Sequence, residues 1–346
     1  MLSRSSFLRR NFATAVRYHA QGVPTEVLKV EAAPAATAAL QAGEVALKFL
    51  AAPINPADLH MIRGGYGIKP TLPAVGGNEG VARVTAVGSG VSGLKVGDRV
   101  IPAVAGFGTW RTDAVAKEAD LLAISSKIPV EYAATLAVNP ATAYRLLADF
   151  ATLKSGDVVI QNAANSAVGQ AVIQLAHLRG IKTINIIRDD EKYAETVQHL
   201  KGLGATIVTT DDYLGSADFK RLIADLPAPK LALNGVGGAS SLQITKALTK
   251  GGVSVTYGGQ SHEPVLVSTT ALIFQDVSVR GFWLSEWSKT APVAERKAML
   301  SELATLFEQG KLRSWVQTYP LADFDQALDT VVLNNLCGLG FMAAAR

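Results

Sequence analysis

The sequence has very little cysteine: Cys337 is the only one in 346 residues. One cysteine cannot form a disulfide within the chain, and it cannot supply a four-cysteine structural zinc site. The sequence therefore excludes a disulfide-stapled scaffold, and it suits a reducing compartment.

Long hydrophobic runs and basic stripes are also missing. The apolar runs, such as DVVIQ and KTINIIR, are far shorter than the about 20 residues that a membrane-spanning helix needs. No stripe of Lys and Arg interleaved with aromatics occurs in the body of the chain, so nucleic-acid binding is not expected. With 49% hydrophobic and 18% charged residues, the chain has a globular composition and is long enough for two domains.

Acidic residues are absent from the start of the chain, where the first is Glu26. Four arginines precede it, namely Arg4, Arg9, Arg10 and Arg17. An N-terminal stretch rich in Arg, Ser and Ala is typical of a mitochondrial transit peptide. We expect residues 1–22 to be such a peptide, cleaved between Asn11 and Gly22, and the mature protein to reside in the mitochondrial matrix. The alternative is a disordered basic arm that binds an acidic partner.

The pattern of predicted secondary structure changes twice along the rest of the chain. Residues 23–139 carry short β-type runs broken by Gly and Pro, which predict a small, mostly antiparallel barrel-like domain. Residues 140–285 alternate strands and helices, which predicts a doubly wound parallel sheet. Residues 286–346 are expected to return to the first domain, with residues 280–312 forming a helix and GFMAA a last strand. The fold class is therefore α/β with two domains.

A turn between a strand and a helix follows Gln161. The segment AANSAVG retains only Gly169 of the three glycines of a dinucleotide-binding turn, with Ala164 and Ala167 where glycine can stand. The free N–H groups at such a helix start attract a pyrophosphate. The motif is weak alone, but its flanking strand and helix support it.

Arg188, Asp189 and Asp190 end the next strand, roughly 20 residues on, where an adenine ribose lies in such sheets. An acid there favours NADH, whereas Arg can bind the 2′-phosphate of NADPH in a bidentate manner. We favour NADPH, with NADH or a solvated strand end as the alternatives. Two later strands end in NGVGG, from Asn234, and in TYGGQ, and glycine there lets a ligand approach the backbone or simply makes a turn.

The segment GGNEGVARVTAVGSGVSGLKVGDRV resembles the signature of the medium-chain dehydrogenase/reductase superfamily. The resemblance extends from about residue 25 to residue 335, and it implies a GroES-like, partly open β-barrel catalytic domain and a Rossmann cofactor domain. Zinc alcohol dehydrogenases of that superfamily have a metal-binding histidine where this chain has Asn78. We therefore expect no metal, and we expect His60 to be structural rather than a ligand.

A hydride-transferring enzyme without metal still needs a group that stabilises negative charge and delivers a proton. Tyr66 is a candidate because a phenol carries its proton at neutral pH. It lies between Gly65 and Gly67, whose backbone freedom would let the ring turn into a cleft. Packing on a surface loop is the other interpretation of this tyrosine.

Several segments together resemble the mitochondrial 2-enoyl thioester reductases, the trans-2-enoyl-CoA or enoyl-[acyl-carrier-protein] reductases. They are INPADLHMIRGGYGIKPTLPAVGGNEG, FGTWRTDAV, AVNPATAYRLL, QNAANSAVGQAVIQLA and VRGFWLSEW. The resemblance implies NADPH-dependent reduction of the 2,3 double bond of an enoyl-CoA or enoyl carrier-protein thioester, the last reductive step of mitochondrial fatty acid synthesis, with Tyr66 as proton donor.

The resemblance also implies the cofactor contacts. They are Asn139, Asn165, Ser166, Ala167, Val168, Arg188, Asp189, Asp190, Tyr257, Gly258, Gly259, Gln260, Phe282, Trp283 and Leu284. Trp283, with Phe282, is further expected along the acyl cavity, since an aromatic wall suits an alkyl chain. The sequence departs from the family at Ala167, where glycine is more usual, and at its C-terminus, which has no lysine.

Two alternative functions are compatible with the same sequence pattern. A zinc-free quinone oxidoreductase would share the superfamily pattern without needing the tyrosine, and a non-catalytic NADPH-binding regulator would bind cofactor without turnover. From the superfamily we expect a homodimer that forms through an edge strand near QDVSVRGFW.

Overall fold

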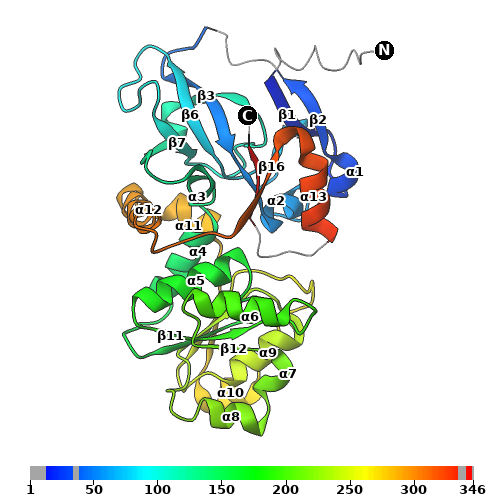
Figure 1. Cartoon of the computed structure of the whole chain (residues 1–346), viewed down its shortest axis with the longest axis vertical. Helices are drawn as coiled ribbons and strands as arrows, with labels where there is room; N and C mark the ends of the chain where they lie inside the picture. The colour runs from blue at the N-terminus through cyan, green and yellow to red at the C-terminus, as the bar shows by residue number, and fades with distance from the viewer. Residues whose placement is uncertain (1–12, 34–38, 334–339, 345–346) are drawn as a thin grey trace. The chain divides into compact units, whose positions relative to one another are not determined.

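The computed structural model describes residues 13–33, 39–333 and 340–344. The chain divides into two compact units: Met1–Ala137 with Leu300–Arg346, and Val138–Met299. Figure 1 shows the strands of the first unit in blue and cyan, joined by the red C-terminal elements, and the second unit in green and yellow. The chain therefore leaves the first unit and returns to it.

The first unit is built from three small sheets. One holds β2 (Lys29–Ala33), β1 (Ala13–Tyr18) and β5 (Ala74–Val75), all antiparallel. The second holds, in order, β8 (Asp113–Lys117), β3 (Glu44–Ala51), β6 (Val81–Val87), β7 (Arg99–Pro102) and β9 (Leu121–Ile124). The third joins β16 (Val316–Pro320) in parallel to β17 (Gly340–Ala344), which pairs with β4 (Pro53–Ile54). The mostly antiparallel architecture that the sequence predicts is confirmed.

Short helices close this unit: α1 (Pro24–Val27), α2 (Pro56–Ile62), α3 (Val130–Ala134) and α13 (Phe324–Leu333). Trp110 is fully buried and packs against Phe324 of α13, with ring centroids 4.9 Å apart. Its indole N–H donates to the carbonyl of Pro53 at 2.8 Å. Trp110 therefore joins the C-terminal helix to the N-terminal core.

The expected leader, residues 1–22, includes the whole of strand β1. Strand β1 pairs along its length with β2, and its residues Ala15, Val16 and Tyr18 are no more than 1% exposed. Cleavage near Gly22 would remove a core strand and expose the groups that it covers. A leader that spares this strand ends before Ala13, and the preceding twelve residues lie outside the described part of the chain.

The second unit contains one six-stranded parallel sheet. Its order is β12 (Ile207–Thr209), β11 (Lys182–Ile186), β10 (Val158–Gln161), β13 (Leu231–Asn234), β14 (Val253–Thr256) and β15 (Ser278–Gly281). Strands β10 and β13 are wholly buried, which explains why their sequences are continuous apolar runs. Strand β15 is an exposed edge.

Helices cover both faces of this sheet. They are α4 (Asn139–Asp149), α5 (Ala167–Leu178), α6 (Tyr193–Gly202), α7 (Asp211–Leu214), α8 (Ala217–Leu222), α9 (Gly238–Lys246) and α10 (Thr269–Gln275). One core contains Phe219 of α8 and Ile244 of α9, and a separate core contains Ile173 of α5 and Leu200 of α6. The sheet is therefore doubly wound, as predicted.

The single helix expected over residues 280–312 is wrong. After β15 the chain forms α11 (Leu284–Thr290) and then α12 (Val293–Glu308), separated at Pro292. Proline has no N–H for a helical hydrogen bond, and it disfavours the helical conformation of the residue before it.

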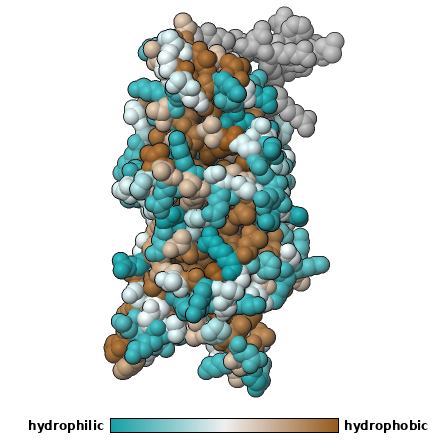
Figure 2. Space-filling view, turned by 90° about the vertical axis from the view of Figure 1, so that its left-hand side faces the viewer, coloured by the Kyte–Doolittle hydropathy of each residue, from teal (hydrophilic) through white to brown (hydrophobic). Residues whose placement is uncertain are grey.

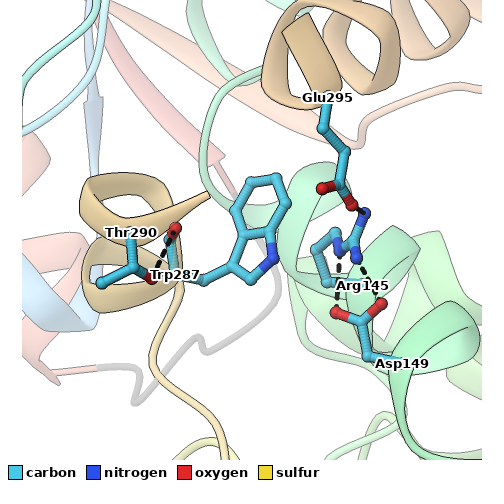
Figure 3. A network of polar contacts seen from close by, with 5 residues as sticks. All are labelled: Arg145, Asp149, Trp287, Thr290 and Glu295. Carbon is cyan, nitrogen blue, oxygen red and sulfur yellow. Dashed lines mark hydrogen bonds and ion pairs between the residues drawn. The ribbon is translucent and has the colours of Figure 1, made fainter. Parts of the chain in front are cut away.

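Arg145 of α4 contacts the elements that follow β15, which belong to the second unit as far as Met299. Figure 3 shows its guanidinium between three side chains. It lies over the ring of Trp287 in α11 at 4.4 Å, bonds Asp149 through Nε at 2.8 Å, and pairs with Glu295 of α12 at 2.8 Å. These contacts hold α11 and the start of α12 on the second unit.

The surface in Figure 2 has apolar side chains among polar ones, as is normal for globular proteins. Across the described residues, no helix combines the length and apolarity needed to cross a bilayer.

Candidate active site

The start of α5 has the form of a phosphate-binding turn. Ser166 precedes the helix, and its hydroxyl accepts a hydrogen bond from the N–H of Gly169 at 3.1 Å. Ala163 in the turn has a positive φ of 49°. Because α5 begins with Ala167, the first N–H groups of the helix, which a helix cannot satisfy itself, lie where the sequence predicts the pyrophosphate.

Gly169 is the one glycine of this turn that packing requires. A Cβ atom there would lie 2.6 Å from the carbonyl oxygen of Ala164 and 2.7 Å from that of Ala163. These contacts are with backbone atoms, which cannot move aside without changing the turn. Gly169 therefore allows the close approach of helix to strand that the third glycine of a dinucleotide fingerprint provides.

Asparagine side chains tie three strand ends together beside this turn. The Asn162 amide donates to Asn234 Oδ1 at 2.8 Å, and the Asn234 amide donates to Thr256 Oγ1 at 3.1 Å. Asn162 Oδ1 accepts from the N–H of Gly235 at 2.7 Å. Neither Asn162 nor Asn234 is among the cofactor contacts predicted from the sequence, although an asparagine directly after an apolar strand is a readable signal.

The two glycine-containing strand ends come together as the sequence indicates. The N–H of Gln260 donates to the carbonyl of Gly235 at 3.1 Å. A Cβ on Gly235 would lie 2.9 Å from the phenol oxygen of Tyr257, so the tyrosine ring rests against the glycine. The segments from Asn234 and from Tyr257 to Gln260 thus form one surface at the carboxyl ends of β13 and β14, where open parallel sheets bind ligands.

Arg188, Asp189 and Asp190 follow β11 and are exposed. Asp190 accepts a hydrogen bond from the N–H of Lys192 at 3.0 Å, so this acid is engaged near the start of α6. Arg188 therefore lies one strand away from the phosphate turn, with its side chain in solvent.

The remaining predicted cofactor residues lie at or just before the first residues of two helices of the same unit. Asn139 is the first residue of α4, and Trp283 directly precedes α11. Phe282 is half-buried and meets Phe150 edge-on, with ring centroids 5.7 Å apart. The Lys289 ammonium lies 5.4 Å from the Trp283 ring.

Tyr66 lies in the first unit on the loop that follows α2. Its half-buried ring is tilted by 59° against His60, with centroids 6.1 Å apart. A Cβ on Gly65 would lie 2.3 Å from His60 Nε2, and Gly64 has a φ of +83°. The glycines before Tyr66 therefore let the loop fold over the imidazole, which brings His60 to the tyrosine.

A buried polar cluster lies around Asn78, the position that is histidine in zinc alcohol dehydrogenases. Asn78 donates to Asp58 Oδ1 from its amide at 2.6 Å and from its backbone at 2.9 Å, and Asn55 donates to Glu79 Oε1 at 2.7 Å. Burial raises the pKa of the Asp58 carboxyl to about 6. In the described part of the chain, no three His, Cys, Asp or Glu side chains gather to hold a metal.

This donor set does not fit a catalytic zinc. Such a site takes three ligands from Cys, His and carboxylate groups. Here both asparagines are committed to the two carboxylates, and the position of the histidine is an amide.

Two family models match the chain. The alcohol dehydrogenase GroES-like domain matches residues 41–126, and the zinc-binding dehydrogenase domain matches residues 167–303. These matches confirm the predicted pair of domains, although the second family is named for a metal that the residues around Asn78 do not suit.

Curated relatives match almost the whole chain. The mitochondrial enoyl-[acyl-carrier-protein] reductase of Rattus norvegicus is 50% identical over 329 residues, covering 94% of this chain and 87% of its own. That of Homo sapiens is 50% identical over 316 residues, covering 91% and 84%.

Solved structures also match almost the whole chain. The complex of Etr1p with NADP and crotonyl-CoA has a TM-score of 0.88 at 34% identity, covering 96% of this chain and 99% of its own. The Etr1p/Etr2p heterodimer of Candida tropicalis has a TM-score of 0.87 at 35% identity, with the same coverage. A quinone oxidoreductase of Pseudomonas syringae has a TM-score of 0.79 at 28% identity, covering 96% and 99%.

Proposed function

Since this chain belongs to the family of mitochondrial enoyl-[acyl-carrier-protein] reductases, we propose that it reduces the 2,3 double bond of trans-2-enoyl thioesters with NADPH. The observation that supports this most directly is Tyr66 on its glycine-rich loop, in a chain about half identical to the named reductases. The reaction belongs to mitochondrial fatty acid synthesis, and its acceptor is an enoyl-CoA or an enoyl carrier protein.

NADPH, when bound, supplies a hydride for the β-carbon of the thioester. The second unit would hold its pyrophosphate on the N–H groups after Ser166 and its 2′-phosphate on Arg188. The surface formed by Gly235 and Tyr257 would contact the rest of the NADPH molecule, because glycine allows a ring to approach the backbone. Asn139 and the segment from Phe282 to Leu284 complete the proposed contacts.

Tyr66 would stabilise the negative charge that develops on the thioester oxygen, and it or a water molecule would then protonate the α-carbon. Its phenol is protonated at neutral pH, so it can donate a hydrogen bond to that oxygen. His60, packed against the ring, would restrict its orientation. Trp283 is proposed to line the path of the acyl chain. No metal is needed for this chemistry.

The test is NADPH consumption with trans-2-hexenoyl-CoA, measured for the wild type and for Tyr66→Phe. Loss of one such donor typically costs about 10²- to 10³-fold in rate, so kcat should fall by that factor while NADPH binding is unchanged. Tyr213→Phe is a matched control, because Tyr213 is exposed in the second unit and should tolerate the change. Unchanged kcat in Tyr66→Phe would contradict its role as acid.

A failure of the wild type with every enoyl thioester would contradict the reaction itself. Turnover with quinones alone would then assign the chain to the quinone oxidoreductases, whose fold it shares. Cofactor binding with no turnover of either substrate would indicate a regulator.

The protein is mitochondrial, as its named relatives are, and we place it in the matrix. We also propose that it forms a homodimer through β15. All four residues of this edge strand are exposed, and nearby α10 exposes Leu272, Ile273 and Phe274 at 44%, 66% and 74%. An exposed strand edge beside apolar side chains favours pairing with a second copy.

A further inference from the structure

Three basic residues of the first unit lie on neighbouring extended segments and form what we term the cation row: Arg111, Arg17 and Lys29. Arg17 lies in β1 and Lys29 in β2, and the two are paired directly in the register of these strands. Arg111 follows the buried Trp110 and pairs across to Ala15 of β1. None of the three has a role in the proposed reaction.

The strand register places the three side chains on one face. Residues directly opposite each other on antiparallel strands point to the same side, and so does the diagonal neighbour two residues along. Arg17 is opposite Lys29, and it is the diagonal neighbour of Arg111 because Arg111 is opposite Ala15. In this geometry, Arg17 comes within about 7–8 Å of Arg111 at the backbone, and their long side chains can reach the same point.

The two arginines are poorly neutralised by their surroundings. Nε of Arg17 and Nε of Arg111 are both buried without a hydrogen-bond partner among the described residues. Arg111 lies over the ring of Phe107 at 5.2 Å and donates to the carbonyl of that residue at 3.3 Å. Burial and the nearby Arg17 lower the pKa of Arg111 to about 10.

One acidic group on this face, Glu31, is already engaged. Glu31 of β2 is opposite Ala15, and its carboxylate pairs with His19 Nε2 at 2.9 Å. Like charges that face each other on a sheet are destabilising, and buried charges need a partner. An anion bound between Arg17 and Arg111 would supply that partner.

The cation row is also connected to the loop of Tyr66. Downstream of Arg17, the N–H of Gly22 donates to the carbonyl of Ile62 at 3.1 Å. Upstream of Arg111, Gly106 approaches Ile68 so closely that a Cβ would lie 3.3 Å from its side chain. Both segments that carry the arginines therefore contact the two ends of the Tyr66 loop.

We propose that Arg17 and Arg111, with Lys29 at the side, bind the phosphate that the pantetheine arm of the thioester substrate carries. Paired guanidinium groups bind phosphate oxygens through several charge-assisted hydrogen bonds. Coenzyme A and a carrier protein both present such a phosphate on the pantetheine arm. This assignment rests on the proposed function, and it names the part of the substrate that the first unit recognises.

The test compares substrates with and without the phosphate. For Arg17→Gln, we expect KM for trans-2-hexenoyl-CoA to rise about tenfold or more, with kcat little changed, because a charge-assisted contact is lost. KM for the N-acetylcysteamine thioester of the same acid, which has no phosphate, should not change. Arg83→Gln is the matched control, since Arg83 is exposed on β6 of the same unit. Arg111→Lys keeps the positive charge but loses the planar pair of guanidinium donors. It should raise KM for the CoA thioester less than Arg17→Gln does, and it should leave KM for the truncated thioester unchanged.

A second measurement does not depend on turnover. Addition of 4′-phosphopantetheine should raise the Tm of the wild type more than pantetheine does, and this difference should vanish in Arg17→Gln. Equal KM changes for both thioesters, or equal Tm effects of the two pantetheines on the wild type, would overturn the proposal. Turnover of the truncated thioester by the wild type keeps the proposed function intact in either case.

The same variants identify the source of the phosphate. A KM increase with enoyl-CoA and with the enoyl carrier protein supports a site for the phosphate they share on the pantetheine arm. An increase with enoyl-CoA alone would overturn that assignment, because it would point to the other phosphates of coenzyme A.

Discussion

Asn78 donates its side-chain amide to the Asp58 carboxylate at 2.6 Å, while its own Oδ1 accepts from the N–H of Gly106 at 2.8 Å. The residue that stands in place of a zinc-binding histidine thus joins α2, which leads into the Tyr66 loop, to the segment before Arg111. The Asn78 side chain therefore connects α2 to the Gly106 segment through two direct hydrogen bonds.

Asp58 should make stability depend on pH. Burial raises its pKa from 3.8 to about 6, so the native state binds more protons than the unfolded state between about pH 4 and pH 6. The contribution of this group to the free energy of unfolding therefore falls as the pH rises through that window, by about 3 kcal/mol. From about pH 4 to about pH 7, the Tm of the wild type should therefore fall relative to the Tm of Asp58→Asn, whose side chain does not titrate.

Asp329→Asn is the control for that experiment, because Asp329 is exposed on α13 of the same unit. The difference in Tm between Asp329→Asn and the wild type should stay constant over the same pH range. A constant difference for Asp58→Asn as well would mean that this carboxyl does not titrate in the native state near pH 6.

Gly169→Ala should destabilise the second unit and weaken NADPH binding. The added Cβ would lie 2.6 Å from the Ala164 carbonyl oxygen, and such overpacking typically costs about 1–3 kcal/mol. Thermal unfolding and NADPH titration measure the two effects. Gly202→Ala, at the end of α6 with nothing within 4 Å of its Cβ, should be neutral or slightly stabilising. Normal NADPH affinity in Gly169→Ala would argue against this turn as the pyrophosphate site.

Arg188→Gln should separate the two nicotinamide cofactors. Loss of a charge-assisted contact with the 2′-phosphate should raise KM for NADPH about tenfold or more and leave KM for NADH unchanged. Steady-state kinetics with both cofactors test this. Lys182→Gln makes the same charge change at the other end of β11 and should alter neither value. If the Arg188 variant kept its preference for NADPH, another residue would have to bind that phosphate.

Phe274→Glu should convert the proposed homodimer into a monomer. Phe274 is 74% exposed on α10, and a charge there would be desolvated in an interface. Solution mass by light scattering measures the change. Leu222→Glu, at a position 55% exposed on α8, should leave the mass unaffected. A wild type that is already monomeric at micromolar concentration would refute the dimer.

Local sequence patterns predicted much of the fold and part of the site. The apolar strand, the turn and the helix around Gly169 are contiguous, so they indicated the dinucleotide-binding unit directly. The reductase assignment rested on such segments too, and the family comparisons confirm it. The helix break at Pro292 was missed, although proline is itself a local signal.

The strand in residues 13–18 was missed for a different reason. The arginine content of residues 1–22 as a whole indicated a leader, whereas the pairing that makes ATAVRY a core strand comes from β2 and from residues 74–75. The prediction used the composition of the segment alone. The partner strands lie elsewhere in the chain, so the composition could not indicate that this segment pairs with them.

By itself, the sequence determined the two-domain class, the doubly wound sheet, the tyrosine between glycines and the asparagine in place of a zinc ligand. Each of these depends on residues adjacent in the chain. Only the tertiary structure decided that Asn162 and Asn234 join strand ends, that β1 belongs to the core, and that Arg17 and Arg111 share one face. These relationships join segments far apart in sequence, and strand register, which no local pattern encodes, determines which side chains meet.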